Sequence, residues 1–343
     1  MQGHALGACS QRRRAVPPAR DCGGVGAPEV RWLRLLRMGK EMASSFGGAG
    51  NLDPTLRSLV SADFAELKTE MRGSTTGVRM LCSDDLSAVV ELSTIAGWNQ
   101  TEDDWRMLLN LAPEGCFGID ADGKLVATTT LFSYGQQLAW VGMVLTKHEY
   151  RGRGFARTLV THALKSADGM GIKTVKLDAT QQGEHLYETL GFQSEGSVER
   201  WSRAGTSNCC APGGNFRSDR LLDSDAAAFG IDRSTMLETL ATRSHVYTGS
   251  NAYLFARSGR TTAYVGPCVG SELAAVEALI TSALKASPSV AWSWDLFPHN
   301  RNAVALALEL GFTRQRVLTR MSRGRTLRSR DEMVYAIAGF ELG

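Results

Sequence analysis

The sequence predicts a mixed α/β (α+β) fold that occurs twice along the chain. From residue 76 onward, strand-like and helix-like hydrophobic patterns alternate. One apolar run, Leu138–Thr146, leads through a glycine-rich turn directly into a helical pattern. The segment His299–Phe312 then repeats the pattern of Thr180–Phe192, so we expect an internal duplication.

Residues 1–75 are expected to lie outside the folded units. The first 40 residues hold eight basic and two acidic side chains, a net charge of +6, and they are rich in glycine, alanine and proline. This composition predicts disorder or an organelle transit segment. An upstream extension, with the working start at Met38 or Met42, is the alternative. Within the extension, a helix is expected over residues 54–71.

The charge and the cysteine content exclude several classes of protein. The chain has a net charge of +3, so the part beyond residue 40 carries −3, which argues against a nucleic-acid partner. No apolar run approaches the length of a membrane span. The seven cysteines show no disulfide framework and no C-x-x-C pair, so we expect no zinc or other metal and a reducing compartment. That compartment is the cytoplasm, unless the Arg-rich N-terminus directs the chain to an organelle.

The first unit, residues 76–203, begins with the elements that precede the glycine-rich turn. A capping box of Thr101 and Asp104 supports the second of two helices, and Ala121-Asp122-Gly123 is a turn signal between two strands. In chain order, the expected elements are a strand at 76–81, helices at 84–95 and 101–111, strands on either side of residues 121–123, and a strand at 136–146.

The turn Glu149–Ala156 (EYRGRGFA) indicates an anion site. Glycines let backbone N–H groups approach an oxyanion, and the start of the following helix adds partial positive charge. Arg151 and Arg153 add two guanidinium groups that suit phosphate oxygens. The turn lacks the Lys-Ser/Thr of a P-loop and the third small residue of a dinucleotide fingerprint. We therefore expect it to bind the pyrophosphate of another kind of ligand.

Two motifs in register resemble those of the GNAT superfamily of acyl-CoA-dependent N-acyltransferases. Arg151, Gly154 and Ala156 match its R-x-x-G-x-A motif, which binds the pyrophosphate of coenzyme A. Tyr187, followed by Gly191-Phe192, matches the family's Tyr-x-x-x-Gly-Phe. The order of the expected elements in the first unit is also that of the family.

The resemblance implies a mixed, mostly antiparallel sheet flanked by helices, whose fourth and fifth strands splay apart. It also implies acetyl-CoA as the co-substrate, with the pantetheine arm in that gap and the diphosphate at the turn. Tyr187 would be the general acid that protonates the leaving thiolate. Thr180 stands where many relatives have an asparagine that contacts the pantetheine. The residues implied in cofactor binding are Val144, Leu145, Thr146, Arg151, Gly152, Arg153, Gly154, Phe155, Ala156 and Thr180.

The acceptor is expected to be a small-molecule amine. In GNAT folds the loop between the first two helices lines the acceptor pocket, which points to Trp98 and Asn99, although Trp98 could equally be a core residue. Asp178 or a water chain would serve as the base, and the alternative for Asp178 is a hydrogen bond to the turn that follows it. His185 is expected to face solvent and Cys116 to lie in the core.

A second, degenerate unit is expected over residues 218–343, after a linker at 204–217. Asn300 stands where Thr180 does, but Ala307 takes the place of the tyrosine, and no R-x-x-G-x-A motif is present. The arrangement resembles tandem GNAT proteins with one active and one degenerate domain. We expect the second unit to line the acceptor pocket of the first.

A non-catalytic acyl-CoA sensor or scaffold is the alternative function, because the Arg151–Ala156 turn would serve both. Retention of Tyr187 favours the enzyme. The expected assembly is a monomer whose two units form an intramolecular pseudo-dimer, or a homodimer, with no nucleic-acid or membrane partner.

Overall fold

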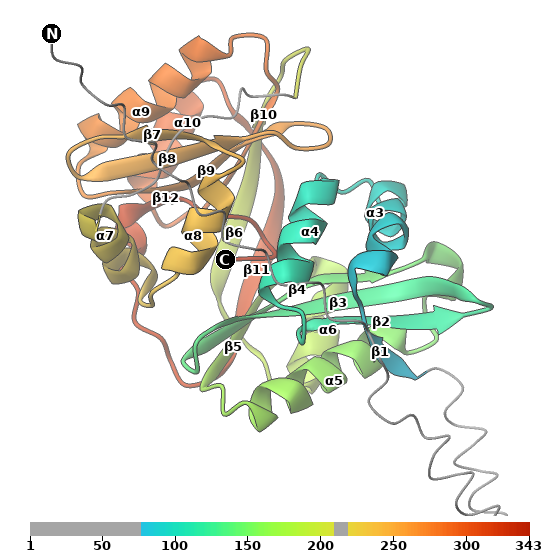
Figure 1. The fold of residues 1–343 in the computed structure, drawn as a ribbon. Helices are drawn as coiled ribbons and strands as arrows, with labels where there is room; N and C mark the ends of the chain where they lie inside the picture. The colour runs from blue at the N-terminus through green and yellow to red at the C-terminus, as the bar shows by residue number, and fades with distance from the viewer. Residues whose placement is uncertain (1–76, 209–218) are drawn as a thin grey trace, which may run out of the picture. The chain divides into compact units, whose positions relative to one another are not determined.

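The computed structural model describes residues 77–208 and 219–343, whose helices and strands are labelled in Figure 1. The expected N-terminal extension, its helix over 54–71 and most of the expected linker lie outside the described residues. Among the described residues, no helix combines the length and the apolar character that crossing a bilayer requires.

The order of elements in the first half is the one that the sequence predicts. Thr101 caps α4 (Glu102–Leu111), because its hydroxyl accepts from Asp104 N at 3.2 Å and the Asp104 carboxylate accepts from Thr101 N at 2.7 Å. The other elements are β1 (Val78–Met80), η1 (Ser83–Asp85), α3 (Leu86–Ile95), β2 (Cys116–Ala121), β3 (Lys124–Tyr134), β4 (Leu138–Thr146), η2 (His148–Tyr150), α5 (Phe155–Gly169), β5 (Thr174–Ala179), α6 (Gln181–Thr189) and β6 (Gln193–Arg203).

The second half repeats the order that follows the first strand of the first half, without the glycine-rich turn and with one further strand at its end. Its elements are α7 (Asp219–Phe229), α8 (Ser234–Ala241), β7 (His245–Thr248), β8 (Ala252–Arg257), β9 (Ala263–Gly270), α9 (Leu273–Ala286), β10 (Trp292–Leu296), α10 (Arg301–Glu309), β11 (Thr313–Gly324), η3 (Asp331–Met333) and β12 (Val334–Ala336). The series β9–α9–β10–α10–β11 corresponds to β4–α5–β5–α6–β6, which agrees with an internal duplication.

All twelve described strands belong to one mixed, mostly antiparallel sheet (Figure 1). The strand order is β1-β2-β3-β4-β5-β11-β6-β10-β9-β8-β7, and β12 pairs with β9 beside this path. Parallel pairs join β4 to β5 and β9 to β10. The two sheets expected from the sequence are therefore parts of one continuous sheet.

The two halves exchange their last strands at the centre of this sheet. β11 of the second half lies beside β5, with Met321 opposite Leu177. β6 of the first half lies beside β10, with Trp201 opposite Trp294. Between these pairs, β6 and β11 are hydrogen-bonded to each other. The sheet of each half is thus completed by a strand of the other half.

β4 and β5 splay apart, as the family resemblance implies. They pair over Leu138–Trp140 and Thr174–Lys176, and no register pair joins the two strands beyond those residues. The gap opens toward the carboxyl ends of both strands. In open α/β sheets, ligands bind beyond the carboxyl ends of the strands, so this gap is the first place to look for a site.

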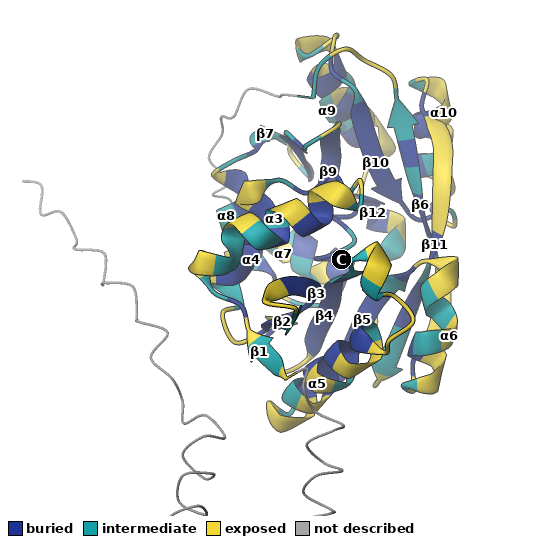
Figure 2. Cartoon of the chain, turned by 90° about the vertical axis from the view of Figure 1, so that its right-hand side faces the viewer, coloured by how far each residue is buried: buried dark blue, intermediate teal, exposed yellow. Residues whose placement is uncertain are grey.

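Apolar side chains of both halves form a shared core against the sheet. α5 buries Leu159, Val160 and Ala163, the positions that its helical period predicts. A second cluster joins Leu108 of α4 to Leu237 of α8, so it includes residues of both halves. Figure 2 shows most of the strands buried, whereas the outer faces of the helices and the first residues of β6 and β11 are exposed. Full burial of a leucine contributes about 1.5–3 kcal/mol, so these contacts help to hold the halves together in addition to the shared strands.

Candidate active site

The glycine-rich turn leaves its backbone open to a ligand. Gly152 and Gly154 have φ angles of +76° and +85°, a left-handed conformation that glycine adopts readily. No atom lies within 4 Å of the position that a Cβ would occupy on either glycine. α5 starts at Phe155, and the N–H groups of its first turn receive no side-chain cap. These N–H groups, together with the helix dipole, can hold an anion.

Arg151 and Arg153 flank this turn and are exposed. Arg151 Nε donates to the carbonyl of Thr146 at 3.2 Å, and an Arg153 NH2 group donates to the carbonyl of Glu149 at 3.1 Å. The guanidinium carbon of Arg153 also lies 4.8 Å from the centroid of the Tyr150 ring. A guanidinium has five N–H donors, so donors remain on both arginines for phosphate oxygens.

β4 bulges where it leaves β5. Met143 and Val144 of β4 together stand opposite the single residue Thr129 of β3. Met143 has a φ of +48°, and its carbonyl accepts from the Thr128 hydroxyl at 2.8 Å. A bulky residue rarely adopts this φ, and such strain is typical of functional sites. Both bulge residues line the cavity between the two strands.

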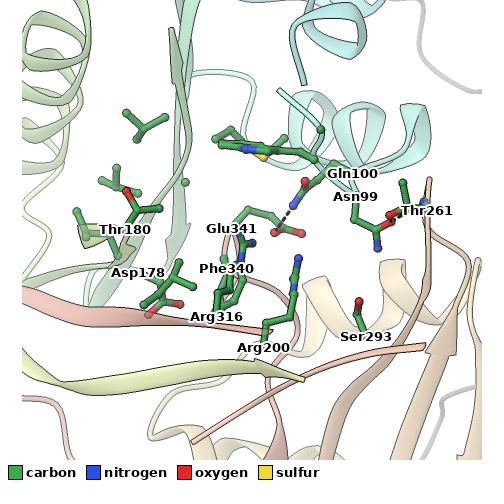
Figure 3. A pocket seen from close by; sticks show the side chains of 18 of the residues that line it. Asn99, Gln100, Asp178, Thr180, Arg200, Thr261, Ser293, Arg316, Phe340 and Glu341 are labelled. Atoms are coloured by element: carbon green, nitrogen blue, oxygen red, sulfur yellow. Dashed lines mark hydrogen bonds between the residues drawn. The ribbon is translucent and has the colours of Figure 1, made fainter. Parts of the chain in front are cut away.

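That cavity has a volume of about 290 Å³ and lies at the gap between β4 and β5 (Figure 3). It brings the three predicted acceptor residues, Trp98, Asn99 and Asp178, together with Thr180 and Tyr187. The turn at 151–156 lies outside the cavity lining. The second half contributes Thr261, Thr262, Ser293, Arg316, Leu318, Phe340 and Glu341. The second half therefore does line this pocket, as expected from the duplication.

Tyr187 presents its side chain to the cavity from α6. The residue is 8% exposed, and the edge of its ring packs on Phe192, with a centroid distance of 6.0 Å. Gly183 makes room for the ring, because a Cβ there would lie 2.9 Å from Tyr187 Cε2. Burial raises the pKa of Tyr187 to about 12. The phenol is therefore protonated at neutral pH and can donate a proton to a group in the cavity.

Asp178 is committed to an ion pair across the two halves. Arg320 of β11 donates to both carboxylate oxygens, at 2.8 and 2.9 Å. The alternative considered from the sequence, a hydrogen bond to the following turn, is wrong, because β11 is inserted beside β5 and brings Arg320 there. Burial raises the pKa of Asp178, and Arg320 opposes that rise. A carboxylate that is paired in this way is a poor candidate for the base.

Asn99 is committed to the second half. Its Oδ1 accepts from the backbone N–H groups of Thr261 and Thr262 at 2.7 and 3.0 Å, and its Nδ2 donates to the Thr262 carbonyl at 2.9 Å. Trp98 is half-buried, lines the cavity and also packs against the core, so a role in acceptor binding stays a prediction. The Asn99 amide positions the loop at 261–262 around the pocket.

Three other residues considered from the sequence are described by their exposure. Thr180 precedes α6, is exposed and lines the cavity. The side chain of His185 is 89% exposed, as predicted. Cys116 is fully buried in the core, as predicted, and burial raises the pKa of its thiol to about 12, so the thiolate form is suppressed.

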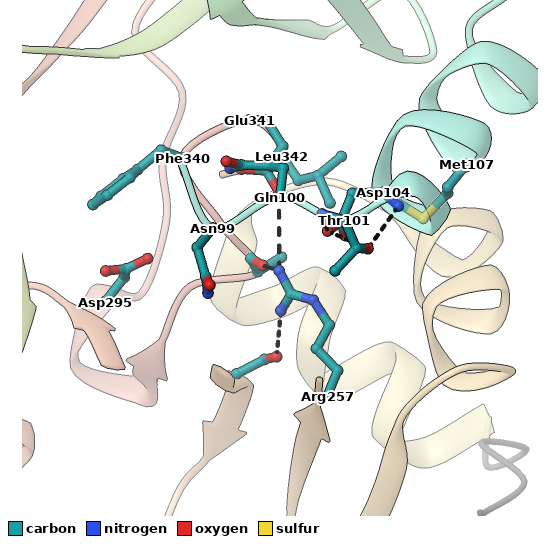
Figure 4. A network of polar contacts seen from close by, with 12 residues as sticks. Asn99, Gln100, Thr101, Asp104, Met107, Arg257, Asp295, Phe340, Glu341 and Leu342 are labelled. Carbon is teal, nitrogen blue, oxygen red and sulfur yellow. Dashed lines mark hydrogen bonds and ion pairs between the residues drawn. The ribbon is translucent and has the colours of Figure 1, made fainter. Parts of the chain in front are cut away.

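Glu341 is a site residue that the sequence did not reveal. It is 3% exposed and lines the cavity, and Gln100 Nε2 donates to its Oε2 at 3.0 Å. Figure 4 shows Arg257 below it, with a guanidinium nitrogen 3.9 Å from Glu341 Oε1. Burial, and then the nearby Asp104 carboxylate, raise the pKa of Glu341. No local motif marks this residue; only the fold of the second half brings it to the first.

The corresponding gap in the second half is filled by the chain itself. β9 and β10 pair over Ala263–Val265 and then diverge. β12 enters this gap, where Val334 and Ala336 pair with β9 and Ile337 N donates to the Asp295 carbonyl at 3.0 Å. Asn300, the counterpart of Thr180, donates to the Val334 carbonyl at 3.0 Å. The second gap therefore has no room for an extended ligand arm.

The described residues hold no group of three or more His, Cys, Asp or Glu side chains that could bind a metal ion.

Two family descriptions match the chain. The Acetyltransferase (GNAT) family matches residues 86–192, and an Acetyltransferase (GNAT) domain matches residues 221–336. Each match covers one half.

Individual proteins resemble the chain as well. The uncharacterized N-acetyltransferase YitH of Bacillus subtilis (strain 168) is 30% identical over 173 residues, which are 48% of this chain and 60% of that protein. The chain thus spans about 60% of the length of this curated relative. A protein of Pyrococcus horikoshii, described as a candidate acetyltransferase, superposes with a TM-score of 0.69 at 20% identity, over 78% of this chain and 96% of that one.

A tandem GNAT protein from the clavulanic acid biosynthesis pathway superposes with a TM-score of 0.52 at 15% identity, over 73% of this chain and 98% of that one. At these identities the two solved structures establish the shared fold. The tandem protein shows that the fold also occurs elsewhere as two such domains in one chain.

Proposed function

Because this chain belongs to the GNAT acetyltransferase family, with two GNAT domains in tandem, we propose that it transfers an acetyl group from acetyl-CoA to an amine of a small-molecule acceptor. One observation carries this proposal. The turn at 151–154 is open and follows β4 in the chain, β4 does not pair with β5 beyond Trp140, and Val144 of β4 and Tyr187 both line the cavity. This sequence of features suits a long thioester carrier with a charged end.

The chain fits acetyl-CoA at each of these places. The N–H groups at the start of α5, flanked by Arg151 and Arg153, would hold the diphosphate. The edge of β4 that faces the gap would pair with the amides of the pantetheine arm, as an added strand does. We assign the expected backbone contacts to Val144, Leu145 and Thr146, with Thr180 at the opposite wall.

In the reaction, a neutral amine attacks the thioester carbonyl directly. The backbone N–H groups at the Met143–Val144 bulge would stabilise the oxyanion, because the bulge removes them from the regular ladder. Tyr187 would donate its proton to the departing thiolate. The cavity supplies proximity by holding both reactants at the same gap. The cavity volume of about 290 Å³ supports a small acceptor.

Binding of acetyl-CoA can be tested at the turn. We expect one equivalent per chain by isothermal titration calorimetry, since β12 fills the second gap. Replacing Gly154 by Val should raise the Kd by at least about tenfold, because strain at a left-handed φ costs about 1–3 kcal/mol and the side chain covers the ligand amides.

Gly169→Val, at the other end of α5, is the matched control, because the space around its Cβ is open and its φ is ordinary. Its Kd should equal that of the wild type. Two bound equivalents, or unchanged affinity in the Gly154 variant, would contradict the assignment of this turn. Acetyl-CoA binding without thiol release for any amine would identify the protein as a sensor instead.

A further inference from the structure

Four charged side chains line the cavity, and two of them are neutralised within the protein. They are Asp178, Arg200, Arg316 and Glu341. Arg320 holds Asp178 through two hydrogen bonds. Arg200 in turn donates to both oxygens of Asp295, at 2.6 and 2.5 Å. Glu341 has only a longer ion pair, 3.9 Å from Arg257, and Arg316 has no acidic partner within 4.0 Å among the described residues, so these two side chains determine most of the charge that a ligand meets.

Arg316 carries a positive charge that the described residues leave without an acidic partner. No carboxylate of the described part of the chain lies within 4.0 Å of its guanidinium group, and the residue is exposed. The guanidinium carbon lies 5.1 Å from the Phe340 ring centroid, and that of Arg200 lies 4.5 Å from the same centroid. Desolvation, and then the neighbouring Arg200, lower the pKa of Arg316. An anion bound here would relieve the repulsion between the two guanidinium groups.

Glu341 is the acidic counterpart, held near the bulge of β4. A Cβ on Gly142 would lie 2.8 Å from Glu341 Cα, so this glycine allows the segment to lie directly against β4. Gln100 binds one carboxylate oxygen, and Arg257 stands 3.9 Å from the other. Figure 3 shows the side chains of Arg200 and Arg316 directed from their strands toward Glu341. A cation and an anion on one small molecule can thus be accommodated side by side.

We propose that the acceptor is an amine that also bears an acidic group, in the manner of an amino acid. Its acidic group binds Arg316 and its amine lies at Glu341, so the second half supplies the acceptor subsite. This inference rests on the proposed acetyl transfer. A simple amine would leave Arg316 without a partner, and a simple acid would meet the Glu341 carboxylate.

The proton transfers then balance. Glu341 accepts a proton from the acceptor ammonium, which frees the lone pair for attack. The C–N bond forms, and the C–S bond breaks as the tetrahedral intermediate collapses. The thiolate receives the Tyr187 proton, and the second proton lost by the nitrogen returns to Tyr187 through water. The products are the N-acetylated acid, the free thiol of coenzyme A and the proton on Glu341, which passes to solvent.

The test compares matched acceptors in a thiol-release assay with acetyl-CoA. The panel contains the twenty common amino acids, and for several of them the amine that lacks the carboxyl group, such as tyramine, histamine and cadaverine. For the best acid-bearing acceptor, kcat/KM should exceed that of its decarboxylated partner by about 10- to 100-fold, as expected for one charge-assisted contact. Arg316→Gln should remove most of this preference by raising KM while leaving kcat nearly unchanged.

Two further variants make the outcome decisive. Arg314→Gln changes an arginine of the same strand that is outside the cavity lining and pairs with Glu199, so the preference should persist. Glu341→Gln keeps the size of the side chain and should lower kcat by at least about tenfold, with the Kd for acetyl-CoA unchanged as evidence that the variant is folded.

Equal kcat/KM for the acids and the amines, an unchanged preference in Arg316→Gln, or transfer to the simple amines but to none of the acids would each overturn the inference. Absence of acetyl-CoA binding, or binding without transfer to any acceptor of the panel, would instead overturn the proposed function. The two failures are therefore distinguishable.

Discussion

Replacing Tyr187 by Phe is expected to lower kcat by about 10²- to 10⁴-fold, the usual contribution of a general acid. The change removes only the hydroxyl group, and the ring can keep its contacts with Phe192 and Gly183. The Kd for acetyl-CoA should therefore stay within about twofold of the wild-type value. Stopped assays of thiol release and calorimetric titration measure the two quantities separately.

The pH dependence of the wild type gives an independent check. Because burial raises the pKa of Tyr187 to about 12, the proton-donating form persists as the pH rises. From about pH 7 to about pH 10, kcat should not fall through loss of this proton. Tyr247→Phe, a change on β7 outside the cavity lining, should leave kcat unaffected. A Tyr187→Phe enzyme with wild-type kcat would show that the thiolate leaves without this acid.

Replacing Arg233 by Met is expected to lower the free energy of unfolding by about 3–5 kcal/mol, because it leaves the charge of Asp225 buried without its partner. Arg233 Nε and an NH2 group each donate to Asp225 at 2.8 Å, and the two side chains are 0% and 1% exposed. The Tyr253 hydroxyl also donates to Asp225. Urea unfolding followed by circular dichroism measures the effect.

Arg330→Met is the matched control, because Arg330 and Glu332 form an ion pair whose side chains are 61% and 68% exposed. Its effect should stay within about 1 kcal/mol. Equal effects of the two substitutions would show that the buried Asp225 pair contributes no more to stability than the exposed pair does. Arg233 also donates to the carbonyl of Gly343 at 3.2 Å, so its loss should loosen the segment that carries Glu341.

The sequence predicts those features of this protein whose geometry is set by residues close together in the chain. The turn from Arg151 to Ala156 has its geometry set by two glycines and by the helix that starts there. Tyr187 lies six residues after the start of α6, which directly follows β5. Its position at the gap therefore follows from the single connection between this strand and this helix. The helix and strand order of the first half follows in the same way from hydrophobic period and capping.

Features that depend on distant partners could not be predicted. Asn99 reaches Thr261 across 162 positions, and Asp178 meets Arg320 across 142. The Asp178 contact exists because β6 and β11 change places between the halves, and hydrophobic alternation does not specify which strand a given edge will pair with. Thr261 and Glu341 reach the cavity only when the second half is packed against the first. Sequence therefore locates the part of the site that we propose for the thioester, whereas the part that we propose for the acceptor requires the assembled fold.

The exchange of β6 and β11 also means that each half covers strand edges of the other. If either half were produced alone, the edges of its outer strands that normally pair across the exchange would be exposed, and bare strand edges recruit other chains into aggregates. Joining the halves in one polypeptide instead guarantees that each partner is present in equal number and at high local concentration. The second half, whose own gap is filled by β12, thereby still covers a strand edge of the first half.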